Sequence, residues 1–118
     1  MMRRLLVAGN WKMNGTRSGA GGLVGGIAEG IASVGDVDVV VCPPFILIPD
    51  VKGQAEGTGI AIGGQNLDIH KDGPYTGEIS GSMLLEYGCS YVIVGHSERR
   101  TLYGESDEVV AEKDVQRV

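Results

Sequence analysis

Short runs of hydrophobic residues recur along the chain and are separated by longer stretches of mixed polarity. Each run is rich in β-branched residues and is bounded by turn-forming residues, which is typical of β-strands. The runs are continuous rather than alternating, which favours parallel strands covered on both faces. We therefore predict strands at residues 5–8, 37–42, 60–62 and 91–94.

The stretches between and after these runs have helical character. The predicted helices span residues 17–34, 45–56, 80–87 and 107–118, and Ser106 is a plausible N-cap for the last of them. Strands that alternate with helices at this spacing predict a right-handed βα repeat and therefore an α/β fold with a parallel sheet.

The first predicted helix is unusual because it is rich in glycine. The chain holds 20 glycines in 118 residues, well above the usual share of about 7%. A phosphate-binding loop is one explanation, but neither GxGxxG nor GxxxxGK[ST] occurs in GAGGLVGGIAEG. We favour a weak helix with Leu23, Val24, Ile27 and Ile31 on one face, stabilised by packing.

Composition and charge exclude several classes of protein. A chain of 118 residues with 42% hydrophobic and 21% charged residues suits one globular domain. No apolar run approaches the roughly 20 residues of a membrane span, and the N-terminal apolar run is too short for a signal peptide. We therefore expect a cytoplasmic protein with Cys42 and Cys89 as reduced thiols. A net charge of −5 argues against nucleic-acid binding.

Polar residues gather where the predicted strands end. The segments GNWKMNG, PPF, GGQN and GHSERR follow the four predicted strands in turn. The carboxyl ends of parallel strands lie at one edge of a sheet, and α/β proteins bind their ligands there. Asn10 and Lys12 are two residues apart, so an extended chain points both side chains to the same side. They suit a carbonyl oxygen and an anion, although a polar turn explains them equally well.

The histidine after the last predicted strand is the second candidate. His96 opens a segment with a probable helix start, where the positive end of the helix dipole favours the neutral imidazole. A neutral imidazole can donate a hydrogen bond to a carbonyl oxygen, but a structural role is about as plausible. Glu98 is either a buried partner of Lys12 or a solvated charge, and Arg99 and Arg100 are expected to form ion pairs.

The segment at residues 66–79 is long for a connection in a compact domain, and such loops are often functional or mobile. Its PYTGE stretch predicts a rigid tip that carries Thr76. Docking of this tip into another subunit and a plain surface loop are equally compatible with the sequence. His70 has no metal-ligand spacing around it, and we interpret it as structural.

The ordered set GNWKMNG, CPPF, GGQN, PYTGEISGSML, YVIVGHSERR and YGESDEVVAEK resembles the triosephosphate isomerase family. The resemblance covers residues 5–113 and implies substrate binding by Asn10 and Lys12, with His96 as the electrophile. In this family the histidine is the standard example of an imidazole kept neutral by a helix N-terminus, so its role here is taken from the resemblance. Glu98 matches an active-site neighbour of the lysine, and Thr76 matches a threonine that reaches into the partner subunit.

The resemblance implies isomerisation between dihydroxyacetone phosphate and glyceraldehyde 3-phosphate, in glycolysis and gluconeogenesis, without a cofactor or metal. A complete (β/α)8 barrel needs about 250 residues. We therefore predict a (β/α)4 half of a TIM barrel, with residues 1–118 as a single N-terminal half-barrel domain. The family's glutamate base follows the sixth strand and its phosphate-gripping loops follow the seventh and eighth. Neither Glu105 nor Glu108 carries a motif that marks a substitute base.

Two consequences follow for the chain by itself. Without the base, we expect it to be inactive or nearly so. A half-barrel also leaves unpaired strand edges and an exposed apolar inner face, so we favour a homo-oligomer or a complex with a complementary C-terminal half. The third alternative is that the 118 residues are one segment of a longer enzyme. The alternative function is a non-catalytic half-barrel that self-associates or binds phosphorylated metabolites.

Overall fold

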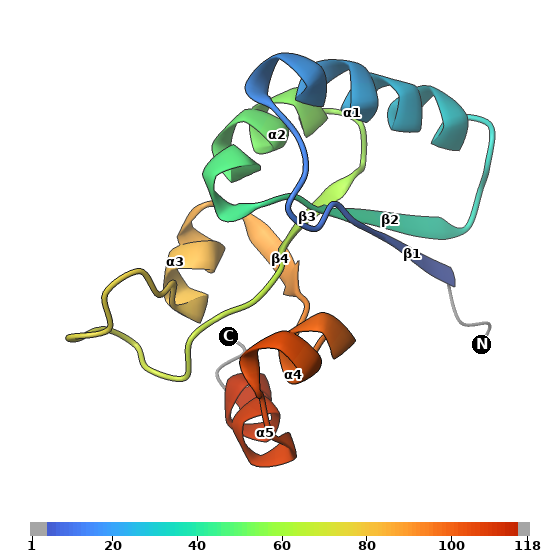
Figure 1. Ribbon diagram of the computed structural model, residues 1–118. Coiled ribbons are helices and arrows are strands. Elements are labelled where there is room, and N and C mark those ends of the chain that lie inside the picture. The colour runs from blue at the N-terminus through green and yellow to red at the C-terminus, as the bar shows by residue number, and fades with distance from the viewer. Residues whose placement is uncertain (1–4, 116–118) are drawn as a thin grey trace.

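The computed structural model describes residues 5–115, which form one parallel sheet flanked by helices (Figure 1). Within that range four strands lie in the order β1-β2-β3-β4, the order in which they occur along the chain. The strands are β1 (Leu5–Asn10), β2 (Val37–Cys42), β3 (Ala61–Gly64) and β4 (Cys89–Val92). All three pairings are parallel, which confirms the predicted α/β architecture.

The bounds of some strands differ from the predicted ones. In these strands the pairing with a neighbour determines the ends, and the hydrophobic run does not. β1 runs two residues past the predicted end because its ladder with β2 continues to the pair Asn10 and Cys42. β4 starts two residues before the predicted start and ends two residues before the predicted end. Its register with β3 shifts at Ile62/Gly63, and this irregularity pairs Cys89 with Ile62 and Tyr91 with Gly63. The apolar run at residues 91–94 alone does not contain that information.

The helices agree with the prediction in position and are generally shorter. They are α1 (Arg17–Ile31), the 3₁₀ turn η1 (Phe45–Leu47), α2 (Ile48–Ala55), α3 (Gly81–Glu86), α4 (Ser97–Tyr103) and α5 (Asp107–Val115). α4 is an element that the prediction did not delimit, although it placed His96 at a helix start. Ser106 caps α5 as expected, because its Oγ accepts a hydrogen bond from the amide of Val109 at 3.2 Å. Residues 116–118 of the predicted last helix lie outside the described residues.

The glycine-rich segment is a helix, as predicted. Thr16 caps α1, and its Oγ1 accepts a hydrogen bond from the amide of Gly19 at 3.0 Å. α1 packs on α2, and Figure 1 shows the two helices together on one side of β1 and β2. Ala20 and Val24 are buried, whereas Leu23 is half exposed, so the predicted apolar face was wrong at that position.

The core lies between the sheet and α1 and α2. Val41 and Ile62 from the sheet pack with Val51 from α2 and with Leu67, which follows β3. The middle of the sheet is tight at two glycines. A Cβ at Gly63 would lie 2.8 Å from Cys42 Sγ, and one at Gly64 would lie 2.8 Å from Leu84 Cδ1. Gly63 also lies against the Tyr91 carbonyl oxygen, at 3.1 Å from such a Cβ, so this position requires glycine, whereas a Cβ at Gly64 would displace the end of the Leu84 side chain.

The sheet is not covered on both faces, which corrects one prediction and confirms another. The side chains of Leu5, Leu6 and Val7 in the edge strand β1 are 68%, 51% and 54% exposed. Coverage on both faces was therefore wrong for β1. Apolar residues on both sides of the edge strand β1 are exposed, in agreement with the unpaired edge that we expected of a half-barrel.

Cys42 and Cys89 are free and buried, as expected for structural thiols. Burial, followed by the charge of the neighbouring Cys89, raises the pKa of the Cys42 thiol to about 11. Residues 5–115 include no helix with the length and apolar character needed to cross a bilayer.

Candidate active site

The turn after β1 presents Lys12 in an uncommon backbone conformation. Lys12 has a φ of 56°, in the left-handed region that costs non-glycine residues free energy. Its amide donates a hydrogen bond to Asn10 Oδ1 at 2.9 Å. The predicted pair of Asn10 and Lys12 is therefore in contact, through the Asn10 side chain and the Lys12 main chain.

Gln65, directly after β3, fixes the same turn from the neighbouring strand. Its Nε2 donates to the carbonyl oxygens of Lys12 and Cys42, each at 2.8 Å. The amide of Trp11 also donates to the Cys42 carbonyl oxygen at 3.1 Å. GGQN follows a predicted strand, but no role was predicted for Gln65. Its position at the ligand edge was the available signal.

Lys12 and Glu98 form an ion pair across the edge of the sheet. Lys12 Nζ lies 2.6 Å from Glu98 Oε1, and the two side chains are 52% and 45% exposed. The hydrogen bond from Lys12 holds the pKa of Glu98 below its usual value. The contact confirms the pairing that we considered for Glu98, but the predicted burial was wrong, because the paired carboxylate is in contact with solvent. The pair is open to solvent and to a ligand.

His96 is the N-cap residue of α4, and its ring orientation is defined by that helix. Its Nδ1 accepts a hydrogen bond from the amide of Glu98 at 3.1 Å. A neutral ring that accepts at Nδ1 carries its proton at Nε2. Glu98 Oε2 lies 3.7 Å from the same Nδ1. The ring therefore has its accepting nitrogen in the helix start and its donor nitrogen free for another group.

Arg99 of α4 and the buried Lys113 of α5 both bind the carboxylate of Glu105. Arg99 Nε donates to Glu105 Oε2 at 2.7 Å, and Lys113 Nζ donates to the same oxygen at 2.5 Å. Lys113 also donates to Asn66 Oδ1 at 2.8 Å, which ties α5 to the segment after β3. Burial opposes ionisation of Glu105, but Lys113 and Arg99 outweigh it and lower its pKa.

Arg100 connects the end of β4 with α5. Its Nε donates to the Gly95 carbonyl oxygen at 2.9 Å and its Nη1 lies 2.5 Å from Asp107 Oδ1. The peptide unit before His96 is therefore fixed from the helix side. The expected ion-pair roles of Arg99 and Arg100 are both confirmed.

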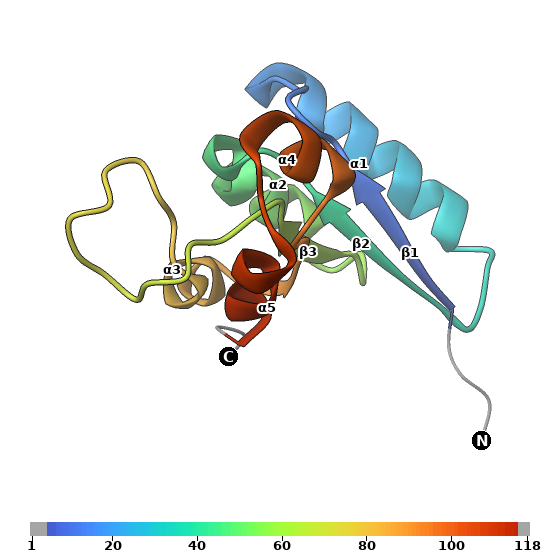
Figure 2. The same cartoon turned by 60° about the horizontal axis from the view of Figure 1, so that its bottom comes forward.

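Thr76 lies apart from these residues. It is on the exposed loop between β3 and α3, which projects away from the sheet in Figures 1 and 2. Within the same loop His70 contacts Asp68 and Tyr75. The structure thus brings Asn10, Lys12, Glu98 and His96 into one connected set and leaves Thr76 on a separate projection.

The connected set suits a small anionic carbonyl compound. It offers an ammonium group, an imidazole N–H and a side-chain amide at one edge of the sheet. Across residues 5–115, no group of three or more His, Cys, Asp or Glu side chains is placed to hold a metal ion. The donors of the connected set can stabilise negative charge that develops on oxygen.

Comparison with known proteins gives a consistent result. The family model described as triosephosphate isomerase matches residues 5–117. Triosephosphate isomerase from Magnetococcus marinus is 52% identical over 113 residues, which cover 95% of this chain and 44% of that protein. The enzyme from Halorhodospira halophila is 53% identical over 115 residues, which cover 97% and 44%. The chain thus spans less than half the length of these relatives.

A solved structure agrees with the sequence relatives. The crystal structure of triosephosphate isomerase from Bartonella henselae at 1.6 Å resolution superposes with a TM-score of 0.87 and 44% sequence identity. The match covers 98% of this chain and 47% of that one.

Proposed function

The chain belongs to the triosephosphate isomerase family, and we propose that it supplies the electrophilic part of an isomerase site for a phosphorylated triose. The reaction interconverts dihydroxyacetone phosphate and glyceraldehyde 3-phosphate by proton transfer. The fold is the (β/α)4 half of a TIM barrel, and residues 1–118 act as its N-terminal half-barrel domain.

The observation that carries this proposal is the unbroken set of contacts from Asn10 through Lys12 and Glu98 to His96. These residues come from the ends of β1 and β4, far apart in the sequence, and they meet at one edge of the sheet. Catalytic residues of TIM barrels come from the carboxyl ends of different strands.

In the proposed reaction a base removes a proton from the carbon next to the carbonyl group. Negative charge then develops on the carbonyl oxygen and gives an enediolate. The proton returns to the neighbouring carbon, and the hydroxyl proton moves to the former carbonyl oxygen, so that the other oxygen becomes the carbonyl of the product. His96 donates from Nε2 to the oxygen, and the Lys12 ammonium stabilises its charge. Asn10 and Lys12 bind the substrate's phosphate and carbonyl side, and Glu98 holds Lys12 in place.

The glutamate that serves as the base in this family is not matched by a residue of these 118. We therefore propose that the chain by itself turns over little or no substrate. Loss of a general base alone lowers rates by about 10² to 10⁴. No cofactor is needed, because every step is a proton transfer.

A protein partner completes the site in this proposal. The exposed Leu5, Leu6 and Val7 support association, because an edge strand with exposed apolar side chains favours contact with another protein surface. The partner is a complementary C-terminal half or a second copy of the chain, and Thr76 contacts the partner's site. We place the protein in the cytoplasm, in glycolysis and gluconeogenesis, and propose no nucleic-acid partner for an acidic chain.

The test is an isomerase assay with the purified chain, free of host enzyme, alone and after mixing with a separately produced C-terminal half. We expect turnover only in the mixture. Lys12→Ala or His96→Gln should then lower kcat/KM by about 10² to 10³, the range for loss of one oxyanion donor. Arg17→Ala, on the exposed surface of α1, serves as the control. Native-like turnover by the chain alone, or full activity of both site variants in the mixture, would reject the proposal.

A further inference from the structure

The loop between β3 and α3 has internal structure of its own. It is closed at its base by the amide of Asp68, which donates to the Ile79 carbonyl oxygen at 2.8 Å. It projects from the body of the molecule in both views (Figures 1 and 2). A projecting loop has few neighbours to hold it, so contacts inside the loop must determine its conformation.

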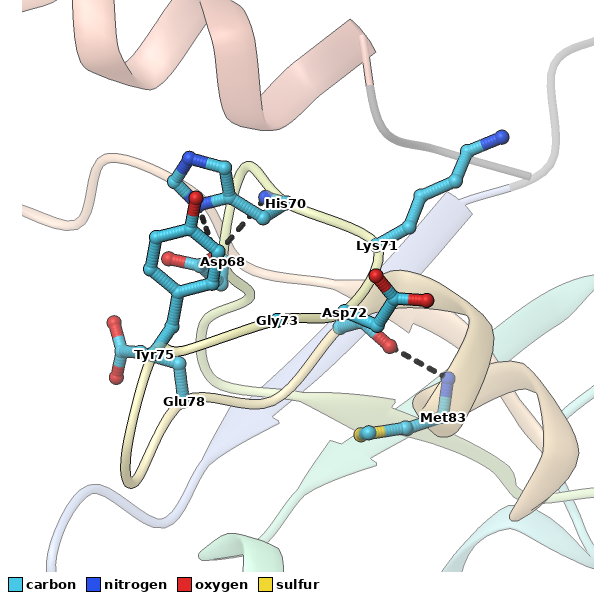
Figure 3. Close-up of a pocket in the computed structure, with 9 residues that line it drawn as sticks. Asp68, His70, Lys71, Asp72, Gly73, Tyr75, Glu78 and Met83 are labelled. Atoms are coloured by element: carbon cyan, nitrogen blue, oxygen red, sulfur yellow. Dashed lines mark hydrogen bonds and ion pairs between the residues drawn. The ribbon is translucent and has the colours of Figure 1, made fainter.

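The first internal contact joins His70 to Asp68. The carboxylate oxygen Oδ2 of Asp68 accepts from the His70 amide at 2.9 Å and lies 2.7 Å from His70 Nδ1 (Figure 3). Burial raises the pKa of Asp68, but the hydrogen bonds from the His70 backbone and ring outweigh this and lower it. One carboxylate oxygen thus fixes both the main chain and the ring of His70.

The second internal contact joins His70 to Tyr75. The two rings are stacked, with centroids 3.6 Å apart and an angle of 9° between their planes (Figure 3). Tyr75 is itself part of a turn, because its amide donates to the Gly73 carbonyl oxygen and its carbonyl oxygen accepts from the Glu78 amide. The stack therefore connects the start of the loop with the turn that contains Thr76.

We infer that Asp68, His70 and Tyr75 form a clamp that holds the loop in one conformation before any partner is present. His70 is then a positioning residue for Thr76, which is adjacent to Tyr75 in the sequence. A tip that is already ordered loses less conformational entropy when it docks. The value of this order for docking rests on the proposed function, in which Thr76 contacts the partner's site.

Four variants of the 118-residue chain separate the contribution of the stacked His70 ring from that of its hydrogen bond to Asp68. His70→Ala removes both the ring and its hydrogen bond. His70→Asn keeps a donor to Asp68 without the stacked ring, and His70→Phe keeps a ring without the side-chain donor. Lys71→Ala is the matched control, since Lys71 is the next residue and its exposed side chain extends away from the ring pair (Figure 3).

The readout is amide hydrogen exchange, measured residue by residue by NMR at Tyr75 and Glu78. We expect His70→Ala to raise exchange there about tenfold or more, which corresponds to about 1.4 kcal/mol of lost local stability. His70→Asn and His70→Phe should give intermediate rates, and Lys71→Ala should match the parent chain. Exchange in β2, and the midpoint of unfolding, should not change, because His70 is not part of the core cluster.

If the Tyr75 and Glu78 amides of His70→Ala exchange at the rate of the parent chain, the inference of a clamp is wrong. The same samples are compared for self-association and for binding to the C-terminal half, and weaker association of His70→Ala supports the link to docking. A loosened loop with unchanged association keeps the clamp and overturns the docking of Thr76. The inference and the proposed function therefore fail by different measurements.

Discussion

Gln65 holds the main-chain carbonyl oxygen of Lys12 at 2.8 Å, although the two residues are 53 positions apart in the sequence. The same Gln65 amide group binds the Cys42 carbonyl oxygen, so one side chain connects the ends of β1, β2 and β3. Lys12 has a positive φ, and a conformation of that kind persists only when its surroundings enforce it. The orientation of the Lys12 ammonium group thus depends on Gln65, an uncharged residue that binds the Lys12 main chain.

Gln65→Leu is expected to disturb the site more than the fold. Loss of the amide leaves the Lys12 carbonyl oxygen without this donor, whereas the Cys42 carbonyl oxygen keeps the amide of Trp11. An unpaired carbonyl oxygen costs about 1–3 kcal/mol where it is shielded from water. In the reconstituted mixture we expect a fall of roughly tenfold or more in kcat/KM. Gln54→Leu, at an exposed position of α2, is the control. Equal activity of the two variants would show that Gln65 does not position Lys12.

Gly25→Ala is expected to stabilise the chain. Gly25 lies inside α1, its φ is not positive, and a Cβ there would meet nothing within 4 Å. Glycine in a helix costs about 0.5–1 kcal/mol relative to alanine, so the free energy of unfolding should rise by that amount. Urea titration followed by circular dichroism measures it.

Gly64→Ala provides the opposite case for the same substitution. Its Cβ would lie 2.8 Å from Leu84 Cδ1 and 3.1 Å from Leu84 Cδ2, so overpacking should cost about 1–3 kcal/mol. If both variants shifted the unfolding midpoint in the same direction, the packing described around β3 would be incorrect.

Stability should depend on pH through Glu105, because Arg99 and Lys113 hold its pKa below the ordinary value of 4.5. A lowered pKa stabilises the folded chain above the unfolded pKa, and this contribution is lost as the pH falls through the folded one. At pH 7 Glu105→Gln should lose on the order of 3 kcal/mol, since it leaves buried Lys113 without its carboxylate.

The difference between the parent chain and Glu105→Gln should shrink below about pH 4.5, which urea unfolding at pH 7, 4.5 and 3 can follow. Glu108→Gln, at an exposed position in α5, should behave as the parent chain at all three values. A constant difference across this range would mean that Glu105 does not ionise within its ion-pair cluster.

Association should depend on the exposed residues of β1. Leu5 and Val7 are two residues apart, so they point to the same side of the strand. We expect the double variant Leu5→Lys/Val7→Lys to sediment as a smaller species than the parent chain at the same concentration. Leu23→Lys, on the half-exposed surface of α1, is the matched control. Identical sedimentation of the double variant and the parent would place the contact elsewhere.

Hydrophobic runs predicted that the strands exist and that they are parallel, since both follow from local composition and spacing. They did not predict the bounds of β4, because its limits follow from the irregular register between Ile62 and Gly63. α4 was not delimited because its sequence, SERRTLY, has no apolar stripe. Gly104 ends that helix with a φ of 68°, and a glycine after a short polar stretch was the signal available in the sequence.

The site shows the same division between local and distant information. Asn10, Lys12 and His96 could be placed at one edge because each follows a predicted strand. The contact between Lys12 and Glu98 was one of two alternatives, and only the relative position of β1 and α4 decides between them. The bond from Gln65 to Lys12 was missed because no local pattern relates a glutamine to a carbonyl oxygen so far away.

The order of the strands in the sheet has a consequence for synthesis on the ribosome. Each of β2, β3 and β4 pairs with the strand that was translated immediately before it. At about 5–20 residues per second, a new strand leaves the exit tunnel within seconds of its neighbour. Pairing within the sheet of residues 5–115 can therefore proceed in the order of translation, because each new strand finds its upstream neighbour already synthesised.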